Sequence, residues 1–409
     1  MRRVVVTGMG LISPLGNDPG AVFDRLLAGE SGIRRLPESF NPRLTSRIVA
    51  PATFAGETRF PAARLRMLDR VSQFALAACA DALADSQLAL GALDKNEIGV
   101  AIGTGMGGAH ATDDGYQRVY EQHSDRVPPF TVLLAMTNAA ASWIGIEHGL
   151  RGPNLTYSTA CSSSAVAIGE AARRIAHGEA RMMIAGGTEA PLTFGTLKAW
   201  EALKTLAEED AANPAASCKP FALNRTGLVL GEGAAILVLE DAEYAKARGA
   251  RVHAEVAGYG LATDTEHITR PSIAGQAKAM TLALASAGIA PAEIGYINAH
   301  GTGTQANDAV ETAAIKEAFG DAARGCPISS TKSMHGHLLG AAGALEFIVA
   351  ILALQRGFVP PTAHLRLRDP ECDLDYVAEG ARAIDAPMAV MSNSFAFGGT
   401  NAVLIARRA

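Results

Sequence analysis

This chain of 409 residues has few aromatic residues, few cysteines and only a small net charge. Only 5% of the residues are aromatic and 19% are charged, whereas 48% are hydrophobic, and this balance excludes intrinsic disorder. The 36 lysines and arginines stand against 41 aspartates and glutamates, so the net charge of −5 gives no basic footprint for nucleic acid. The five cysteines are odd in number and include no C-x-x-C pair, so we expect neither a disulfide framework nor a metal site.

Long hydrophobic runs are also missing. At the N-terminus, two arginines precede a short apolar run that ends at Gly8, which predicts a buried first strand rather than a signal peptide. The most apolar later segment, Leu338–Leu354, carries Glu346 and is shorter than the roughly 20 residues that a membrane span needs. We therefore expect a cytoplasmic protein with no membrane partner, in which this segment is a core helix.

Short β-branched runs alternate with alanine-rich stretches of helical length along the whole chain. Helices are predicted over residues 68–86, 162–177, 275–287 and 338–355, and strands over 4–6, 98–102, 182–185, 235–239, 252–257, 294–299, 328–330, 390–392 and 403–405. This alternation is typical of an α/β protein with mostly buried strands. A charged stretch at 243–251 separates two sections that each open with a strand leading into glycine, which favours a duplication with halves 1–250 and 251–409.

One cysteine has an unusual setting. Cys161 lies among small residues in Ser158–Ser164, directly before a predicted helix. The positive end of a helix dipole lowers the pKa of a thiol and favours the nucleophilic thiolate. The competing interpretation is a buried, inert cysteine, which is common in alanine-rich chains.

Two further segments follow predicted strands and carry histidines. His300 lies in Asn298–Thr304, where glycines and hydroxyls suit a loop that holds a polar, elongated ligand, although a hydrogen-bonded histidine in a turn gives the same pattern. Lys332, His335 and His337 lie in Ser330–His337. The H-x-H pair has no acidic or cysteine partner at metal-ligand spacing, so neutral imidazoles that donate hydrogen bonds to a carbonyl are the better interpretation.

Two further segments are glycine-rich turns. The turn within Ser392–Asn401 follows a strand, and its backbone N–H groups could form half of an oxyanion hole. Gly103, Gly105 and Gly108 match G-x-G-x-x-G, but residues 109–115 look like a poor helix start, so we do not expect a dinucleotide site there.

The chain resembles the β-ketoacyl-acyl-carrier-protein synthases, above all the elongating type II enzymes of bacterial fatty-acid synthesis. The resemblance rests on the lone cysteine followed, in this order, by the motifs N-A-H-G-T-G-T, T-K-S-M-H-G-H and N-S-F-A-F-G-G-T-N. The resemblance covers essentially the whole chain. It implies a thiolase fold, with two pseudo-repeated halves in a five-layered α-β-α-β-α sandwich. It also implies an acyl-carrier protein as partner, a homodimer, and no cofactor beyond the phosphopantetheine arm of the carrier.

The family's chemistry implies roles for the matching residues. Cys161 would take the acyl chain as a thioester, and the backbone N–H groups of Cys161 and Phe397 would hold the oxyanion. His300 and His337 would donate hydrogen bonds to the malonyl thioester, whose decarboxylation gives an enolate. Claisen condensation then lengthens the chain by two carbons. Lys332 would sit in a charged network that orients the histidines, with partners Asp308, Glu311 and Glu346.

The resemblance also implies contacts to the substrates. Thr302 and Thr304 match hydroxyls that touch the phosphopantetheine arm, Phe397 matches a gate over the acyl pocket, and Met106 falls where the family sets pocket depth. Leu228 replaces a phenylalanine on the malonyl side. Carrier docking falls on the cluster Arg64, Arg66 and Arg70, for which a solvated helix end is the competing interpretation.

Some features favour a specialised pathway within the family. His335 and the stretch 300–308 look more like the nodulation-type and polyene-forming synthases than the housekeeping ones. The alternative to fatty-acid synthesis is therefore a ketosynthase of a polyene, nodulation-factor or polyketide pathway, and its partner subunit could be a chain-length-factor paralogue. Three other enzyme classes do not fit, because this sequence lacks a residue that each requires. They are a thiolase with a second reactive cysteine, a Cys-His-Asn condensing enzyme and a papain-like hydrolase.

Overall fold

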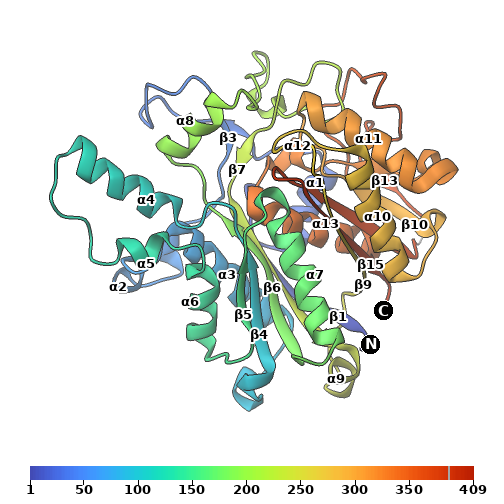
Figure 1. Ribbon diagram of the computed structural model, residues 1–409, viewed down its shortest axis with the longest axis horizontal. Helices are drawn as coiled ribbons and strands as arrows, with labels where there is room; N and C mark the ends of the chain where they lie inside the picture. Colours follow the sequence, from blue (N-terminus) through green and yellow to red (C-terminus); the bar gives the residue numbers. More distant parts are fainter. Residues whose placement is uncertain (386) are drawn as a thin grey trace.

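One sheet of ten strands runs through the molecule in the computed structural model, which describes residues 1–385 and 387–409 (Figure 1). The strands lie in the order β11-β10-β14-β15-β9-β1-β8-β6-β4-β5. Their bounds are β1 Val4–Ile12, β4 Ile98–Gly103, β5 Asn154–Tyr157, β6 Met182–Glu189, β8 Gly233–Asp241, β9 Ala254–Thr263, β10 Ile294–Asn298, β11 Ile328–Ser329, β14 Ala389–Phe395 and β15 Thr400–Arg407. Each predicted strand overlaps one of these, whereas β5 was not predicted.

The sheet consists of two halves with the same topology. From the middle outwards, one half reads β1-β8-β6-β4-β5 and the other β9-β15-β14-β10-β11. In both halves the first two neighbouring pairs are antiparallel and the last two are parallel. The halves join where β1 pairs with β9. The proposed boundary at 250/251 falls between α9 (Ala242–Ala247) and β9.

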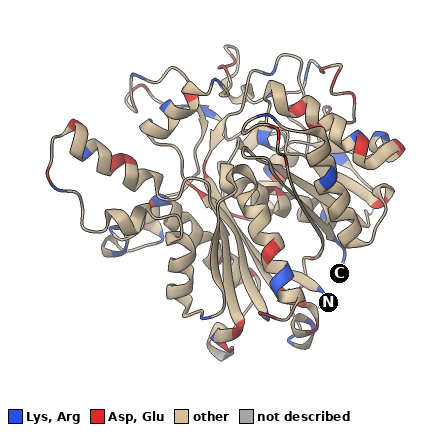
Figure 2. Cartoon of the chain, in the orientation of Figure 1, with Lys and Arg blue, Asp and Glu red and all other residues tan. Residues whose placement is uncertain are grey.

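Helices cover both faces of each half. The central layer contains α7 (Ser163–Ala176) and α13 (Ala342–Arg356), which share one hydrophobic core with both halves of the sheet. A second core holds α3 (Arg70–Asp85) and α6 (Ala139–His148) against the first half, and a third holds α10 (Ile273–Ala287) and α11 (Gln305–Phe319) against the second. The result is the predicted five-layered α-β-α-β-α sandwich. Charged residues gather on the outer helices and loops, and few lie on the strands (Figure 2).

The most apolar segment is a core helix, as predicted. The stretch Leu339–Arg356 is long and apolar enough to cross a membrane, but 89% of it is buried inside the fold. Its residues from Ala342 to Leu354 are all buried. A helix that is hydrophobic all round belongs in such a central layer, because both of its faces meet a sheet.

The remaining elements are short. They are α1 (Pro19–Leu27), α2 (Ala62–Leu65), α4 (Ala109–Tyr116), α5 (Thr131–Ala135), α8 (Phe194–Ala202), α12 (Lys332–His335), β2 (Arg34–Arg35), β3 (Ile48–Ala50), β7 (Leu230–Gly231), β12 (Phe358–Val359) and β13 (Arg382–Ala383), together with a π-helical turn at Gln117–Glu121 and several 3-10 turns.

The interpretation of residues 109–115 as a poor helix start is wrong, because α4 begins at Ala109. Tertiary contacts supply what the local sequence lacks, since the Ala111 N–H donates to the carboxylate of Asp69 at 2.8 Å. The glycine loop before α4 is nevertheless unsuited to a phosphate. The N–H groups of Gly105 and Met106 already donate to the carboxylate of Glu189, at 2.6 and 2.9 Å, and a second anion would be repelled there.

Candidate active site

The segments that follow four strands, β5 in the first half and β10, β11 and β14 in the second, meet at one site. Cys161 follows β5 in the first half, and Lys332–His337 follow β11, the strand that occupies the same position in the second half. His300 follows β10, and the turn 396–399 follows β14. Because β10, β11 and β14 are neighbouring parallel strands, their carboxyl ends lie at the same edge of the sheet, where open α/β sheets build their sites.

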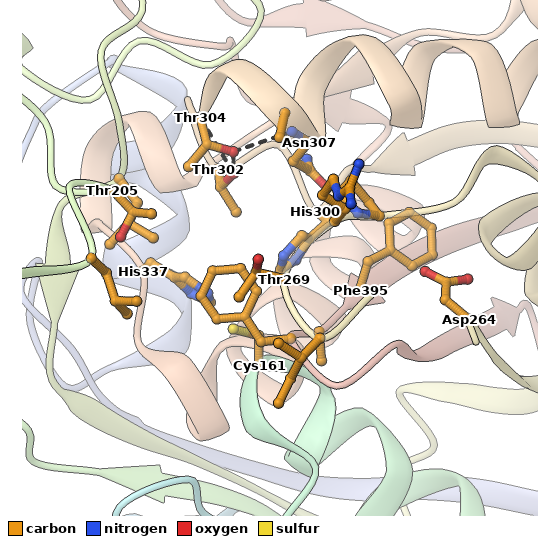
Figure 3. Close-up of a pocket in the computed structure, with 18 of the residues that line it drawn as sticks. Cys161, Thr205, Asp264, Thr269, His300, Thr302, Thr304, Asn307, His337 and Phe395 are labelled. Carbon is orange, nitrogen blue, oxygen red and sulfur yellow. Dashed lines mark hydrogen bonds between the residues drawn. The ribbon is translucent and has the colours of Figure 1, made fainter. Parts of the chain in front are cut away.

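Cys161 lies in a strained turn just before a helix. The 3-10 turn Ala160–Ser162 precedes α7, and Ala160 has a φ of +49°, in the left-handed region that L-residues rarely adopt. The Ser163 hydroxyl stabilises this turn, because it accepts from the Thr159 N–H at 2.9 Å and donates to the Ala160 carbonyl at 2.6 Å. The turn directs the thiol away from the helix and into a pocket (Figure 3).

The two histidines face this sulfur. The Sγ of Cys161 and one ring nitrogen each of His300 and His337 all lie within 4.8 Å of one another (Figure 3). The two rings meet edge to face, with centroids 5.4 Å apart and an angle of 83° between them. The backbone fixes both residues, because the His337 N–H donates to the Val229 carbonyl at 2.6 Å and the His300 N–H donates to the carboxylate of Glu311 at 2.8 Å. The structure thus brings together the three residues that the sequence singled out.

The pKa of the thiol differs from the expectation. Burial raises the pKa of Cys161 to about 12, and the charge of Lys332 and a hydrogen bond from the Phe397 backbone N–H offset this only in part. The expected lowering of the pKa by the helix dipole is therefore wrong as a net effect, because the thiol is buried. The same burial, aided by Lys332, holds the pKa values of His300 and His337 well below their usual range. Both imidazoles are therefore neutral and able to donate an N–H.

Of the three expected partners of Lys332, one forms an ion pair with it. The Nζ of Lys332 lies 2.5 Å from the carboxylate of Glu346, and both side chains are fully buried. Burial raises the pKa of Glu346 to about 7, against the opposing effect of the lysine charge. A buried charge without a partner is costly, so the two residues depend on each other.

The other two carboxylates hold the histidine loop from behind. Glu311 accepts the N–H groups of His300 and Gly301 at 2.8 and 2.7 Å, and Asp308 accepts the N–H of Thr302 at 3.1 Å. Both residues lie in the first two turns of α11. Asp308 and Glu311 therefore shape the loop 300–304 rather than pair with Lys332.

A cavity of about 270 Å³ opens above the cysteine (Figure 3). The hydroxyls of Thr302 and Thr304 lie 2.9 Å apart on one wall of it. Leu228 and Phe397 also line it, as the resemblance implied. Asn307, Phe395 and Asn401, from the segments 300–308 and 392–401, line it too, and further lining residues that the sequence did not indicate include Trp200, Leu203, Thr205, Asp264 and Thr269.

Two residues of functional interest were missed. The ring of Trp200 in α8 stacks on Phe397, with centroids 6.0 Å apart, and so packs against the proposed gate. Glu189 is fully buried at the end of β6, where its carboxylate accepts the N–H groups of Gly105, Met106 and Gly340. Its position at the end of a parallel strand was the signal that could have identified it.

Other predicted residues lie elsewhere. Met106 is 43% exposed in the single chain and does not line this cavity. Arg64 pairs with Glu147 at 2.6 Å, and Arg70 pairs with the buried Glu232 at 2.6 Å.

Arg66, at the end of α2, is exposed. His335 forms hydrogen bonds to the Gly336 carbonyl and the Thr331 hydroxyl, so it does not converge with His337 on a metal.

This fold and this site define the class of thiolase-fold condensing enzymes, in which a cysteine and two histidines share one pocket. The chain belongs to the β-ketoacyl synthase family. The family's N-terminal domain matches residues 1–245, and its C-terminal domain matches residues 253–366.

Named relatives resemble the chain over its full length. Nodulation protein E of Rhizobium meliloti is 43% identical over 403 residues, 98% of each chain. The 3-oxoacyl-[acyl-carrier-protein] synthase 2 of Staphylococcus aureus is 40% identical and covers 100% of this chain and 98% of its own. The solved ketosynthase of a type II polyketide system, in complex with its acyl-carrier protein and bound to the hexaketide, is 32% identical with a TM-score of 0.92, over 100% and 99% of the two chains.

Proposed function

We propose that this protein is a 3-oxoacyl-[acyl-carrier-protein] synthase that lengthens acyl chains by two carbons in fatty-acid biosynthesis. The observation that carries this proposal is the meeting of the Cys161 sulfur with two neutral imidazoles in one cavity. A nucleophile and two neutral N–H donors are what acyl transfer followed by enolate formation requires. The family and the named relatives support the same chemistry.

In the first half-reaction, the sulfur of Cys161 attacks the thioester carbonyl of the acyl-carrier protein. Because the pKa of the thiol is high, its proton must leave as the bond forms, and either His300 or His337 alone has a ring nitrogen within reach to accept it. The N–H groups of Cys161 and Phe397 hold the oxyanion of the tetrahedral intermediate. The carrier thiol then leaves with the proton, and the acyl chain stays on the sulfur.

In the second half-reaction, a malonyl group on a carrier enters the same cavity. His300 and His337 donate hydrogen bonds to its thioester oxygen, so the enolate formed by loss of carbon dioxide is stabilised in a buried site. The enolate carbon attacks the acyl thioester, a carbon–carbon bond forms, and Cys161 leaves as a thiolate that regains a proton. The Lys332–Glu346 pair lies close enough for the lysine charge to help keep both imidazoles neutral.

Both substrates arrive on the phosphopantetheine arm of the carrier, so the reaction needs no separate cofactor. Thr302 and Thr304 present hydroxyls to this arm along the cavity wall. The carrier docks beside exposed Arg66, whereas Arg64 and Arg70 are engaged in ion pairs with Glu147 and Glu232. Five free cysteines, all buried, suit the reducing cytoplasm.

A second copy of the chain covers an exposed apolar face. The segment from α4 to α5 extends away from the body of the molecule (Figure 1), and β5 forms an edge of the ten-stranded sheet. Large apolar side chains are exposed across this region, namely Tyr116, Val119, Tyr120, Val127, Phe130, Val132, Leu133, Ile146 and Leu155. Such a patch is typical of a protein interface. Met106 lies in the neighbouring turn, so this contact would also bury it.

The relatives support one alternative within the same chemistry. Nodulation protein E and the polyketide ketosynthase match 98% and 100% of this chain, as fully as the 3-oxoacyl-[acyl-carrier-protein] synthase does, so a specialised pathway is the second candidate. The difference lies in the acyl chain that Cys161 accepts.

A condensation assay with two variants tests the proposed mechanism. With acyl- and malonyl-carrier thioesters, the native protein should release carbon dioxide and form a product two carbons longer. Cys161→Ser should lose both acyl loading and condensation, because an alcohol is a poor nucleophile at neutral pH. His337→Ala should keep acyl loading but slow decarboxylation about 100- to 1000-fold, the usual cost of one lost oxyanion donor. Condensation at the native rate in His337→Ala would refute the role given to this histidine.

A further inference from the structure

The three groups that carry the reaction also form a set of soft metal ligands. Among the described residues, the Cys161 sulfur and one nitrogen each of His300 and His337 form a buried group within 4.8 Å, and no carboxylate oxygen belongs to it. Among the described residues, His300 Nδ1 and both ring nitrogens of His337 are buried without a hydrogen-bond partner, so no hydrogen bond competes with a metal for these three nitrogens. The buried carboxylates around the site are already engaged, Glu346 by Lys332, and Glu311 and Glu189 by backbone N–H groups.

We propose that a thiophilic divalent cation of the zinc type binds Cys161, His300 and His337 and reversibly inhibits the enzyme. Thiolate and imidazole are the ligands that zinc prefers, whereas magnesium and calcium prefer oxygen. Zinc–nitrogen and zinc–sulfur bonds of about 2.0 and 2.3 Å place tetrahedral ligand atoms roughly 3.5 Å apart. Small side-chain rotations are therefore enough to bring the three ligand atoms from the observed spacing to the spacing of a tetrahedral site. The fourth coordination position of the metal then faces the cavity and takes a water molecule.

The binding step is a simple exchange. The Cys161 thiol loses its proton to solvent, a sulfur–metal bond forms, and each imidazole donates one nitrogen lone pair, so no electron is transferred. The ammonium of Lys332 repels the bound cation, because the carboxylate of Glu346 neutralises the lysine charge only in part. We therefore expect binding at micromolar metal, weaker than in four-ligand structural zinc sites.

The bound cation stops both half-reactions. It occupies the sulfur lone pair that attacks the acyl thioester, and it holds the imidazole nitrogens that would otherwise face the malonyl oxygen. This inhibition rests on the proposed function. The binding itself does not, because it follows from the ligand geometry alone, and the two are therefore tested separately.

Titration with Cd²⁺ and Co²⁺ tests the binding. The full-length protein should bind one Cd²⁺ and show a thiolate-to-metal charge-transfer band in the ultraviolet, and Co²⁺ should give the visible absorption of a tetrahedral site. Cys161→Ala should remove the charge-transfer band, and His300→Ala should weaken binding at least tenfold. Cys79→Ala is the matched control, because Cys79 is a buried cysteine in α3 and should leave the band unchanged. No band in the native protein, or an equal band in Cys161→Ala, would overturn the proposal.

Inhibition is measured in a second experiment. Acyl loading by the native protein should fall with added Zn²⁺ over the range in which Cd²⁺ binds, and a chelator should restore it. Undiminished loading at saturating metal would overturn the inhibitory role. If the metal-free protein neither loads acyl groups nor condenses them while the charge-transfer band forms, the proposed function fails and the metal site stands.

Discussion

At the scale of single residues, burial sets the chemistry of the nucleophile. The thiolate is the reactive form of a cysteine, and burial raises the pKa of Cys161 to about 12. Alkylation of Cys161 by iodoacetamide should therefore accelerate about tenfold per pH unit from about pH 7 to about pH 10, without a plateau. Intact-mass analysis at each pH gives the rate, and Cys161→Ala identifies the adduct. A plateau below about pH 8 would contradict this, because it would show a thiol that ionises near neutral pH.

The sequence was a good guide to which residues react and a poor one to their electrostatics. Cys161 was identified by its small neighbours and the helix that follows it, and His300 and His337 by their places after strands. The argument from the helix dipole predicted the wrong direction for the pKa of Cys161, because burial raises this pKa. The burial of a thiol depends on tertiary packing, which a local sequence pattern does not reveal. The pairing of Lys332 with Glu346, and not with Asp308 or Glu311, likewise depends on how α11 and α13 pack.

At the scale of elements, Glu189 ties two turns together beside the nucleophile. Its carboxylate accepts hydrogen bonds from the backbone N–H groups of Gly105, Met106 and Gly340. Leu339, which precedes Gly340 in the chain, packs in one hydrophobic cluster with Cys161. Leu339 is itself in the left-handed region, with a φ of +45°, so its position needs this support. The two turns approach so closely that a Cβ on Gly340 would lie 2.5 Å from the Gly105 nitrogen.

Glu189→Gln should therefore destabilise the protein by about 2–5 kcal/mol and lower kcat for condensation, because an amide presents an N–H to donors that need an acceptor. Denaturant unfolding and the condensation assay measure the two effects. Glu97→Gln is the control: it removes an exposed ion pair with Arg181, which is worth about 1 kcal/mol or less. Equal stability of the two variants would show that Glu189 does not hold the turns.

Apolar patterns identified most of the buried elements, although the apolar helix α6 was missed, and the polar elements were not predictable. The strands and the four predicted helices are hydrophobic runs that the buried layers require. By contrast, α11 was missed because Asn307, Asp308 and Glu311 occupy its buried positions, where they hold the histidine loop. The edge strand β5 was missed because its residues are polar or half-exposed, and α4 because contacts outside its own sequence stabilise it.

At the scale of the whole molecule, the two halves divide the reaction between them. The first half supplies the nucleophile after β5, and the second supplies the ammonium and an imidazole after β11, the strand that takes the same place in the other half. From its residues, the sequence indicated a duplication only through the charged stretch at 243–251 and the strand leading into glycine that opens each section. The matching strand order could not be predicted, because strand neighbours are set by long-range pairing.

The apolar face formed by α4, α5 and their surroundings should hold two chains together. Val132 and Leu133 are 76% and 52% exposed, so replacing both by glutamate should leave the fold intact but separate the subunits. Light scattering should then give half the mass of the native protein. Leu367→Glu, at a similarly exposed leucine in the second half of the chain, should keep the native mass. An undiminished mass after the double substitution would place the interface elsewhere.

The proposed reaction requires that Cys161 carries the growing chain and gives it up to a malonyl-derived enolate. Intact-mass analysis after incubation with a panel of acyl-carrier thioesters tests it most directly. We predict one acyl adduct per chain, mapped to Cys161, absent from Cys161→Ala, and cleared when malonyl-carrier is added. The acyl group that loads fastest will also separate fatty-acid synthesis from a specialised pathway. An adduct on another residue, or one that malonyl-carrier leaves in place, would contradict the account.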